Sequence, residues 1–249
     1  MPRNDAAFKF AGKGTNVAEA FDAVIVGAGP AGLMVASELS ARGCRVLVAE
    51  AKPSVARKFL MAGKSGLNLT KDEPIDALLP HYEEAADWLA PMLQEFDAQA
   101  VQDWARGLGQ EIFSGSTGRV FPKVMKAWPL LRAWLAELDD KGVEIRTRWR
   151  WTGWAGEALR FDTPEGLVEV EAKATVLAMG GASWARLGSD GAWSEALAVR
   201  GVEMTPFAPA NAGLLVNWST HMAPLFGAPI KGVALHCAGR VSRGGGGDL

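Results

Sequence analysis

The chain has 249 residues, of which 49% are hydrophobic and 22% are charged, with a formal net charge of −2 and a pI near 6.0. This length and composition fit a globular protein of one large domain or two small ones. The nearly balanced charge gives no electrostatic basis for binding nucleic acid or an anionic membrane surface.

The chain shows no sign of a targeting segment, a membrane span or a metal site. Residues 1–20 carry charges throughout and lack an apolar core, so we expect a disordered extension. No apolar run approaches the roughly 18 residues that a membrane-spanning helix needs. Cys44 and Cys237 are far apart and have no metal-binding spacing. We therefore expect a cytoplasmic protein whose partner is a small-molecule substrate, with no metal, nucleic acid or membrane.

The first predicted elements form a βαβ unit. Residues 22–26 (DAVIV) are typical of a strand buried on both faces of a parallel sheet. Residues 29–42 carry apolar side chains at helical spacing and predict a helix. A second strand over residues 44–49 ends on Glu50, and the crossover between the two strands should be right-handed.

A glycine-rich turn, GAGPAG from Gly27 to Gly32, joins the first strand to the helix. In a dinucleotide-binding loop the first glycine allows the tight turn, the second lets a pyrophosphate approach the backbone, and the third lets the helix pack closely on the strand. The helix N-terminus adds unpaired N–H groups for phosphates. Glu50 follows 18 residues after Gly32, where a carboxylate can bind ribose hydroxyls. Because a carboxylate repels a 2′-phosphate, FAD or NAD is favoured over NADP.

A basic segment follows the second strand. Residues 51–70 are rich in Gly, Lys, Arg and Ser and predict a loop. Its cations Arg57, Lys58 and Lys64 suit a pyrophosphate or the polar edge of a flavin, although a solvated basic loop explains the composition equally well. The segment is not a P-loop, because no glycine stands at Walker A spacing before Lys64.

The middle of the chain predicts a helical and hairpin excursion at about 72–128. Residues 74–107 should be mostly helical, and residues 111–121 should form a β-hairpin. An amphipathic helix is expected over residues 127–140. In the first of these helical segments, the side chains that predict a core face are Trp88, Leu89, Met92, Leu93 and Phe96.

The second half predicts mainly strands. They are expected over residues 143–151, 157–162, 166–171, 174–181, 213–217 and 231–237, with a short helix over 191–200. The last residues, SRGGGGDL, predict a flexible Gly-rich tail.

One of these strands bears on the choice of cofactor. Residues 174–181 (ATVLAMGG) end in Met179, Gly180 and Gly181. This ending resembles the second glycine motif of two-dinucleotide-binding-domain flavoproteins, in which a late strand of the sheet passes beside FAD. Together with the first glycine motif it favours FAD over NAD.

Four longer motifs, together with GAGPAG, resemble the HI0933-like (YhiN-type) flavoproteins, in particular an aminoacetone-oxidase-like subgroup. They are RKFLMAGKSGLNLT, VFPKVMKAWPLLRAWL, MGGASWARLGSDGAW and PANAGLLVNW, and the resemblance covers roughly residues 20–240. It implies an α/β fold: an FAD-type Rossmann parallel sheet over residues 21–200 and the start of a β-rich inserted domain over residues 201–249.

The resemblance also implies which residues bind FAD. The phosphates would lie on Gly27, Ala28, Gly29, Pro30, Ala31 and Gly32, and the adenosine ribose on Glu50. Ala51, Lys52, Arg57, Lys58, Ser65, Gly66, Leu67, Asn68, Met179, Gly180 and Gly181 would line the rest of the cofactor, and the Trp149–Trp151 strand would offer backbone contacts near the adenine. Many relatives have Arg-Cys-Asn where this chain has Gly66-Leu67-Asn68, so only the asparagine carries over.

We therefore expect an FAD-dependent oxidoreductase that transfers hydride between a small organic substrate and the flavin, with NAD(P)H as a reductant by resemblance only. No residue stands out as a catalytic acid or base. His81, His221 and His236 are scattered, and Ser189-Asp190 is better explained as a helix N-cap than as a catalytic pair.

Two other functions stay open. Family members continue through an inserted domain and return with a glycine–acid motif that binds the ribityl chain, and nothing in residues 182–249 matches that return. One expectation is therefore a truncated, non-catalytic fragment that binds FAD or ADP and has an incomplete isoalloxazine site. The other is an NAD-dependent dehydrogenase.

Overall fold

The computed structural model describes residues 20–62, 66–208, 217–237 and 239–248. The chain divides into two compact units, Met1–Phe207 and Ala208–Leu249. Each is described by itself. The expected domain boundary at residues 200/201 stays a prediction.

In the first unit the strands are β1 (Ala20–Val26), β2 (Val46–Glu50), β3 (Thr70–Lys71), β4 (Ile112–Ser114), β5 (Arg119–Pro122), β6 (Glu144–Thr147), β7 (Arg150–Ala155), β8 (Ala158–Thr163) and β9 (Gly166–Leu177). The α-helices are α1 (Pro30–Ala41), α2 (Arg57–Ala62), α3 (Ile75–Leu78), α4 (Ala86–Glu95), α5 (Ala98–Gly107), α6 (Ala127–Asp140) and α7 (Trp193–Val199). Short 3₁₀ helices are η1 (Leu79–Ala85) and η2 (Ala185–Leu187).

The main sheet has six strands in the order β6-β2-β1-β9-β8-β7. The first four are parallel, and β9, β8 and β7 form an antiparallel meander. The expected α/β fold with a Rossmann-type parallel sheet is therefore confirmed. The single long strand β9 belongs to both parts, because it pairs with β8 up to Val170 and with β1 from Glu171 onwards.

Two separate strands were expected where β9 runs, and this expectation is wrong. The strand is continuous from Gly166 to Leu177 and stops before Met179-Gly180-Gly181. The polar residues Glu169, Glu171 and Lys173 look like a break in the sequence, but they alternate with apolar residues along the strand. The strand expected over residues 143–151 is likewise two strands, β6 and β7, separated at Arg148 by a positive φ of 59°.

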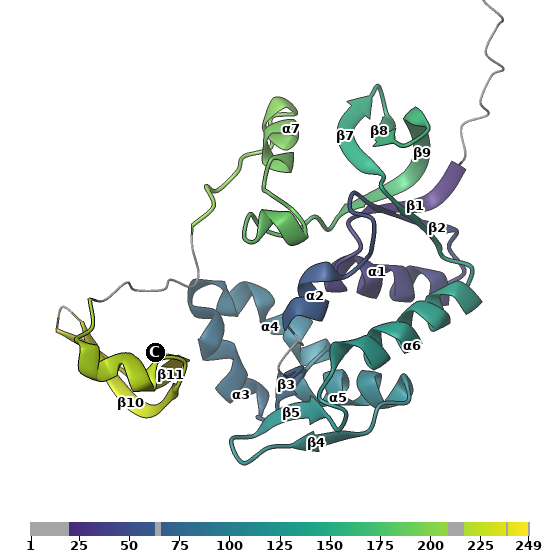
Figure 1. The fold of residues 1–249 in the computed structure, drawn as a ribbon. Helices are drawn as coiled ribbons and strands as arrows, with labels where there is room; N and C mark the ends of the chain where they lie inside the picture. The colour runs from purple at the N-terminus through teal and green to yellow at the C-terminus, as the bar shows by residue number, and fades with distance from the viewer. Residues whose placement is uncertain (1–19, 63–65, 209–216, 238, 249) are drawn as a thin grey trace, which may run out of the picture. The chain divides into compact units, whose positions relative to one another are not determined.

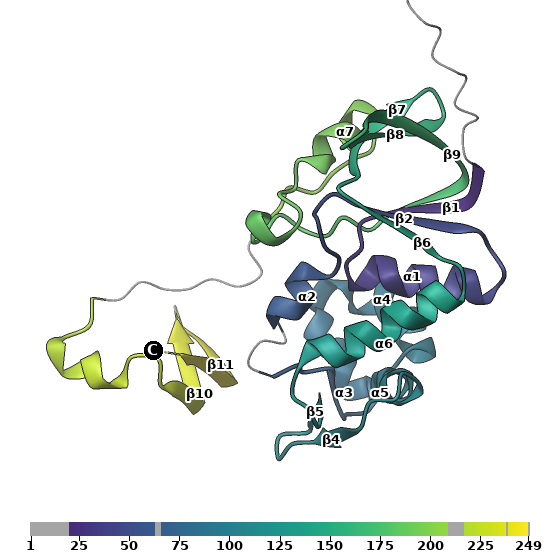
Figure 2. The same cartoon turned by 45° about the vertical axis from the view of Figure 1, so that its right-hand side comes forward.

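The sheet separates two apolar cores, because side chains alternate between its faces. On one face Ile25, Val46 and Val48 pack against α1 and α6. On the other face Val24, Val26, Leu47 and Ala49 pack against the meander, including Trp151 and Phe161, and against α7. Figures 1 and 2 show α1 and α6 together on one side of the sheet and the curved meander on the other.

A smaller layer lies beyond α6. The hairpin β4–β5 forms where it was expected, and β3 adds a third antiparallel strand to it. The expected helix over residues 127–140 is also confirmed as α6. A third apolar cluster is formed by four buried residues: Leu67, Ala105 of α5, and Ala127 and Leu130 of α6.

The loop expected over residues 51–70 contains a helix, α2, so this part of the expectation is wrong. The turn into α2 is fixed on the glycine loop, because the Ala56 N–H donates to the Ala28 carbonyl at 2.8 Å and Ala56 is buried. Phe59 and Leu60 of α2 then pack against the cores beside α1 and α6. Two apolar contacts therefore stabilise a helix inside a segment whose composition resembles a loop.

The prediction that Trp88, Leu89, Met92, Leu93 and Phe96 form a core face is wrong, because α4 does not bury these side chains. None of the side chains of α4 is buried, and Trp88, Met92 and Phe96 are exposed by 68%, 48% and 41%. The core face of this segment lies on α5 instead, where Ala98, Gln102 and Ala105 are buried. The helical periodicity predicted the apolar stripe of α4 correctly, but it does not say whether another element packs against that stripe.

The second unit contains the 3₁₀ helix η3 (Thr220–Leu225) and the antiparallel hairpin of β10 (Pro229–Cys237) and β11 (Arg240–Asp248). β10 confirms the strand expected over residues 231–237. The expected flexible tail is wrong, because residues 240–248 form β11; backbone hydrogen bonds with β10 need no side chains. The strand expected over 213–217 and all but the last residue of the 1–20 extension lie outside the described residues. Ala20 begins β1.

Among the described residues, no helix combines the length and hydropathy required to span a bilayer. The expected cytoplasmic location stays a prediction.

Trp134 of α6 provides a test of the core on the helical side. Its side chain is 1% exposed, its indole N–H donates to Ser37 Oγ at 2.8 Å, and it packs edge-on against Trp104. We expect Trp134→Ala to lower the free energy of unfolding by about 3–5 kcal/mol in urea denaturation. Trp128→Ala is the matched control, because Trp128 lies on the same helix with 54% of its surface exposed. It should cost about 1 kcal/mol or less. Equal losses in the two variants would contradict the described core.

Candidate functional site

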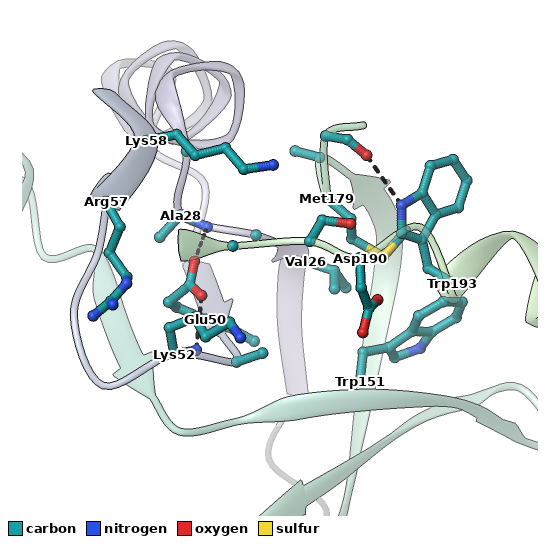
Figure 3. Close-up of a pocket in the computed structure, with 18 of the residues that line it drawn as sticks. Val26, Ala28, Glu50, Lys52, Arg57, Lys58, Trp151, Met179, Asp190 and Trp193 are labelled. Atoms are coloured by element: carbon teal, nitrogen blue, oxygen red, sulfur yellow. Dashed lines mark hydrogen bonds between the residues drawn. The ribbon is translucent and has the colours of Figure 1, made fainter. Parts of the chain in front are cut away.

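A cavity of about 780 Å³ opens at the carboxyl ends of β1, β2 and β9 (Figure 3). Three parts of the chain form its wall: the glycine loop with the segment from Ala49 to Phe59, the start of β7, and the segment between Ser183 and Ala196. β1 lies between β2 and β9, and the chain leaves β1 through α1 towards β2. Ligands of open α/β sheets bind at such a place, outside the carboxyl ends of the strands.

The glycine loop is fixed by two close backbone approaches. A Cβ at Gly27 would lie 2.5 Å from the Ala178 carbonyl oxygen that follows β9, and φ at Gly27 is +108°. A Cβ at Gly32 would lie 1.9 Å from the carbonyl oxygen of Gly27. Side chains at these positions would therefore separate β1 from the residues after β9, and α1 from β1.

Gly29 differs from its two neighbours in the motif. A Cβ there would meet no atom within 4 Å, so the space beside Gly29 is open. Gly29 is the N-cap residue of α1, Pro30 follows at the first helical position, and the first helical hydrogen bond runs from Leu33 N–H to the Gly29 carbonyl. The N–H groups of Ala31 and Gly32 precede that bond and have no helical carbonyl to donate to. The helix N-terminus is thus available to an anion.

Glu50 ties the end of β2 to the glycine loop. Its Oε2 accepts a hydrogen bond from Ala28 N–H at 3.0 Å, and its Oε1 accepts one from Lys52 N–H at 2.8 Å. These bonds orient the carboxylate at the cavity wall before any ligand arrives. Each carboxylate oxygen has a second lone pair, so hydroxyl donors of a ligand can still bind.

Three of the predicted cations lie on the cavity wall: Lys52, Arg57 and Lys58. Lys58 Nζ lies 3.5 Å from the Gly181 carbonyl oxygen, so this side chain spans from α2 to the residues after β9. Arg57 donates to Ser54 Oγ at 3.4 Å, and its Nε is buried with no hydrogen-bond acceptor among the described residues. The cations neighbour the helix N-terminus, which gives this end of the cavity a positive character.

The start of β7 forms the opposite wall. Trp149 N–H donates to the Glu50 carbonyl at 2.9 Å, which fixes this strand beside the end of β2. Trp151 is 9% exposed and packs edge-on against Trp154. The Trp149–Thr152 stretch lines the cavity, and the predicted contact of this strand with the adenine stays a prediction.

The segment after β9 contributes groups that the sequence did not predict. Trp193 Nε1 donates to the Gly180 carbonyl at 3.0 Å and holds the start of α7 on the end of β9. Asp190 Oδ1 accepts from Ala192 N–H at 3.1 Å, and Ser189 Oγ accepts from Gly191 N–H at 3.2 Å. This turn precedes α7, whose N-cap residue is Ala192 and has no side-chain cap, so the expected Ser189-Asp190 N-cap is wrong.

The electrostatics around Asp190 favour its charged form. The hydrogen bond from Ala192 N–H, together with the positive charges of Arg150 and Lys52, holds the pKa of this carboxyl below its ordinary value. Asp190 is therefore ionised at neutral pH. The cavity thus has two carboxylates that accept backbone N–H groups, one after β2 and one after β9.

Most of the predicted cofactor-binding residues converge on this cavity. Those that line it are Gly27, Ala28, Gly29, Pro30, Ala31, Glu50, Ala51, Lys52, Arg57, Lys58, Trp151, Met179, Gly180 and Gly181. Gly32 supports the loop from behind. The structure does not place Gly66, Leu67 or Asn68 on the cavity wall, because Leu67 is buried in the apolar cluster with Leu130. Their role in cofactor binding stays a prediction. Ser65 lies outside the described residues.

Of the three histidines, only His81 belongs to the unit that contains the cavity, and it does not line the cavity. His81 is on η1 and faces Glu73 at 3.9 Å, while His221 and His236 belong to the second unit. Within the described part of the first unit, no histidine therefore lines the cavity. The carboxylates of Asp190 and Glu195 line the cavity instead. They lie there because of the path that the chain takes after β9, and no local sequence motif predicts that path.

The profile of the HI0933-like protein Rossmann domain matches residues 21–247. The chain therefore belongs to the HI0933-like family.

Two solved structures align with part of this chain. A flavocytochrome c3 fumarate reductase in its open conformation aligns with a TM-score of 0.50 at 20% identity, over 66% of this chain and 34% of that one. The 3-ketosteroid-Δ4-(5α)-dehydrogenase of Rhodococcus jostii RHA1, in complex with 4-androstene-3,17-dione, aligns with a TM-score of 0.48 at 14% identity, over 66% of this chain and 46% of that one. The chain thus spans less than half the length of either.

The glycine loop provides a paired test of packing against ligand binding. We expect Gly29→Ala to leave the free energy of unfolding within about 0.5 kcal/mol of the wild type, since the added Cβ meets open space. The same methyl should raise the Kd for ADP at least about tenfold by occupying the space of the pyrophosphate.

Gly32→Ala should behave in the opposite way. Its methyl would clash with the Gly27 carbonyl and cost about 3 kcal/mol or more of stability in urea denaturation. If Gly29→Ala bound ADP as the wild type does, the assignment of Gly29 to the phosphates would be wrong.

Proposed function

We propose that this member of the HI0933-like family is an FAD-dependent oxidoreductase, which transfers hydride between a small organic substrate and the flavin. The observation that carries the proposal is the cavity at the carboxyl ends of β1, β2 and β9, where the glycine loop, the N-terminus of α1 and Glu50 converge. The similarity in fold to a flavocytochrome c3 fumarate reductase agrees with such an activity.

The residues present fit the ADP half of FAD. The open space beside Gly29 and the unpaired N–H groups of Ala31 and Gly32 suit the pyrophosphate oxygens. The free lone pairs of Glu50 suit the two hydroxyls of the adenosine ribose, and its charge disfavours a 2′-phosphate at the same place. Lys58 and Lys52 offset the negative charge of the phosphates.

The other half of the cofactor would extend over the end of β9. There Met179, Trp193 and Leu187 offer apolar surface, and the carbonyl oxygens of Gly180 and Gly181 are already bound by Trp193 and Lys58. FAD, when bound, supplies the two-electron chemistry, and these residues would orient it and exclude water. Apolar walls with a few placed polar groups are typical of cofactor sites.

The finer parts of the proposal rest on the family resemblance. We propose NAD(P)H as the reductant and an aminoacetone-oxidase-like subgroup, and no residue is assigned as a catalytic acid or base. Two other functions, an NAD-dependent dehydrogenase and a non-catalytic fragment that binds FAD or ADP, are outcomes of the following experiment.

The cofactor is tested by the visible absorbance spectrum of the purified, desalted protein. We expect the two bands of a bound flavin, and heat should release a chromophore that co-elutes with authentic FAD in chromatography. Release of FMN or of NAD would contradict the proposal. A colourless protein that gains no flavin spectrum after incubation with FAD would reduce the function to nucleotide binding or to none.

The reductant is tested by anaerobic mixing of the flavin-loaded protein with NADH or NADPH. We expect the visible flavin absorbance to decrease and to return on admission of air. Because the 2′-phosphate of NADPH need not enter the Glu50 site already filled by FAD, both dinucleotides should be tried. No bleaching with either one, while dithionite bleaches the flavin, would remove NAD(P)H from the proposal.

A further inference from the structure

The chain between β9 and α7 contains a segment, residues 181–190, which we call the strap. Leu187 and Ser189 of the strap line the cavity, whereas Trp184 is 64% exposed. The strap therefore lies between the cavity and solvent on this side of the site.

Both ends of the strap are fixed on the first unit. It begins after Gly180 and ends before Gly191, and these glycines have φ values of +70° and +84°. Trp193 Nε1 donates to the Gly180 carbonyl at 3.0 Å, a bond that joins the two ends. Gly191 is buried, and a Cβ there would lie 2.9 Å from the ring of Phe207. A surface loop whose ends meet in this way has the form of an Ω-loop.

The middle of the strap is held much more weakly than its ends. No residue from 181 to 190 is buried. Its backbone hydrogen bonds are local, from Leu187 N–H to the Trp184 carbonyl and from Gly188 N–H to the Ala185 carbonyl. A segment with few buried apolar contacts opens at a low free energy. The strap can therefore open between its fixed ends while the sheet stays folded.

Lys58 joins the middle of the strap to α2, which belongs to another part of the cavity wall. Its Nζ lies 3.5 Å from the Gly181 carbonyl oxygen, and a Cβ at Gly188 would lie 3.1 Å from its Cε. The φ of Gly188 is −172°, which any residue adopts, so the glycine is needed for the room that it leaves to the Lys58 side chain. Figure 3 shows Lys58 extending from α2 towards the side on which Met179 and Trp193 lie.

We propose that the strap is a lid on the cavity and that Lys58 is the latch that holds it closed. A nucleotide enters and leaves the cavity when Lys58 releases the strap. Because an ammonium group has three donors, Lys58 can bond to a phosphate and to the Gly181 carbonyl together, so a bound nucleotide keeps the strap closed. Such closure excludes water from a bound cofactor. The part played by the nucleotide rests on the proposed function, whereas the latch does not.

The latch is tested by hydrogen–deuterium exchange, read by mass spectrometry, on the full chain without ligand. Lys58→Met removes the ammonium group, and Gly188→Ala keeps the charge but displaces the end of the Lys58 side chain. Each variant should raise the exchange rate of the strap amides about fivefold and leave peptides from β1 and β2 unchanged. Unchanged exchange of the strap in Lys58→Met would overturn the latch.

Lys123→Met is the matched control. Lys123 is an exposed lysine that pairs with Glu111 at the surface and does not line the cavity. The same substitution there should leave the exchange of the strap as in the wild type. If it accelerated the strap as Lys58→Met does, the effect would come from net charge and the latch would be overturned. Thermal unfolding of each variant shows whether the fold is retained.

The lid is tested by stopped-flow binding of ADP to the full chain freed of flavin, with tryptophan fluorescence as the signal. A latch is a barrier in both directions, so Gly188→Ala should raise the association and dissociation rate constants about fivefold each and leave the Kd within about twofold. A change confined to the dissociation rate would make the contact of Lys58 a simple binding contact and overturn the lid. Wild-type protein that bound neither ADP nor FAD would instead contradict the proposed function, and the exchange experiment would still decide on the latch.

Discussion

The candidate site depends on one steric constraint, the close approach of three backbone segments at Gly27. A Cβ on Gly27 would lie 2.5 Å from the Ala178 carbonyl oxygen, and a Cβ on Gly32 would lie 1.9 Å from the Gly27 carbonyl oxygen. This contact brings the end of β1, the start of α1 and the residues after β9 together. The N–H groups of the helix, the carboxylate of Glu50 and the turn around Asp190 then meet around a single cavity.

Strand β9 makes this meeting possible because it belongs to both the parallel and the antiparallel part of the six-stranded sheet. Its first half is antiparallel to β8 and its second half is parallel to β1. The meander is therefore held in a fixed position over one face of the parallel sheet. This position of the meander brings Trp151 of β7 to the cavity. The hydrogen bond from Trp149 N–H to the Glu50 carbonyl holds the start of β7 beside the end of β2.

Elements that depend on neighbouring residues in the sequence were predicted well. Features that depend on contacts between distant parts of the chain were predicted poorly. The residues from Gly27 to Glu50 follow one another in a βαβ unit, so turn chemistry, helix period and strand composition agree, and all these elements form as predicted. The apolar stripe of α4 was real, but no local signal says which stripe is covered. Asp190 was missed because its place depends on the continuation of the chain beyond β9. The glycines of β11 were taken for a tail because propensity scales describe side chains, whereas the ladder with β10 uses the backbone.

The position of β9 in the chain also bears on how the protein is made. β1 is an inner strand of the parallel part of the sheet, and its neighbour β9 pairs with it across a sequence separation of 151 residues, from Val26 to Leu177 (177 − 26). During synthesis, β1 and β2 leave the ribosome long before β9 exists. One edge of β1 then carries unpaired backbone groups beside an apolar surface, a situation that favours association between nascent chains. The same late pairing that builds the cavity leaves this edge of the nascent chain open to such association until β9 has been translated.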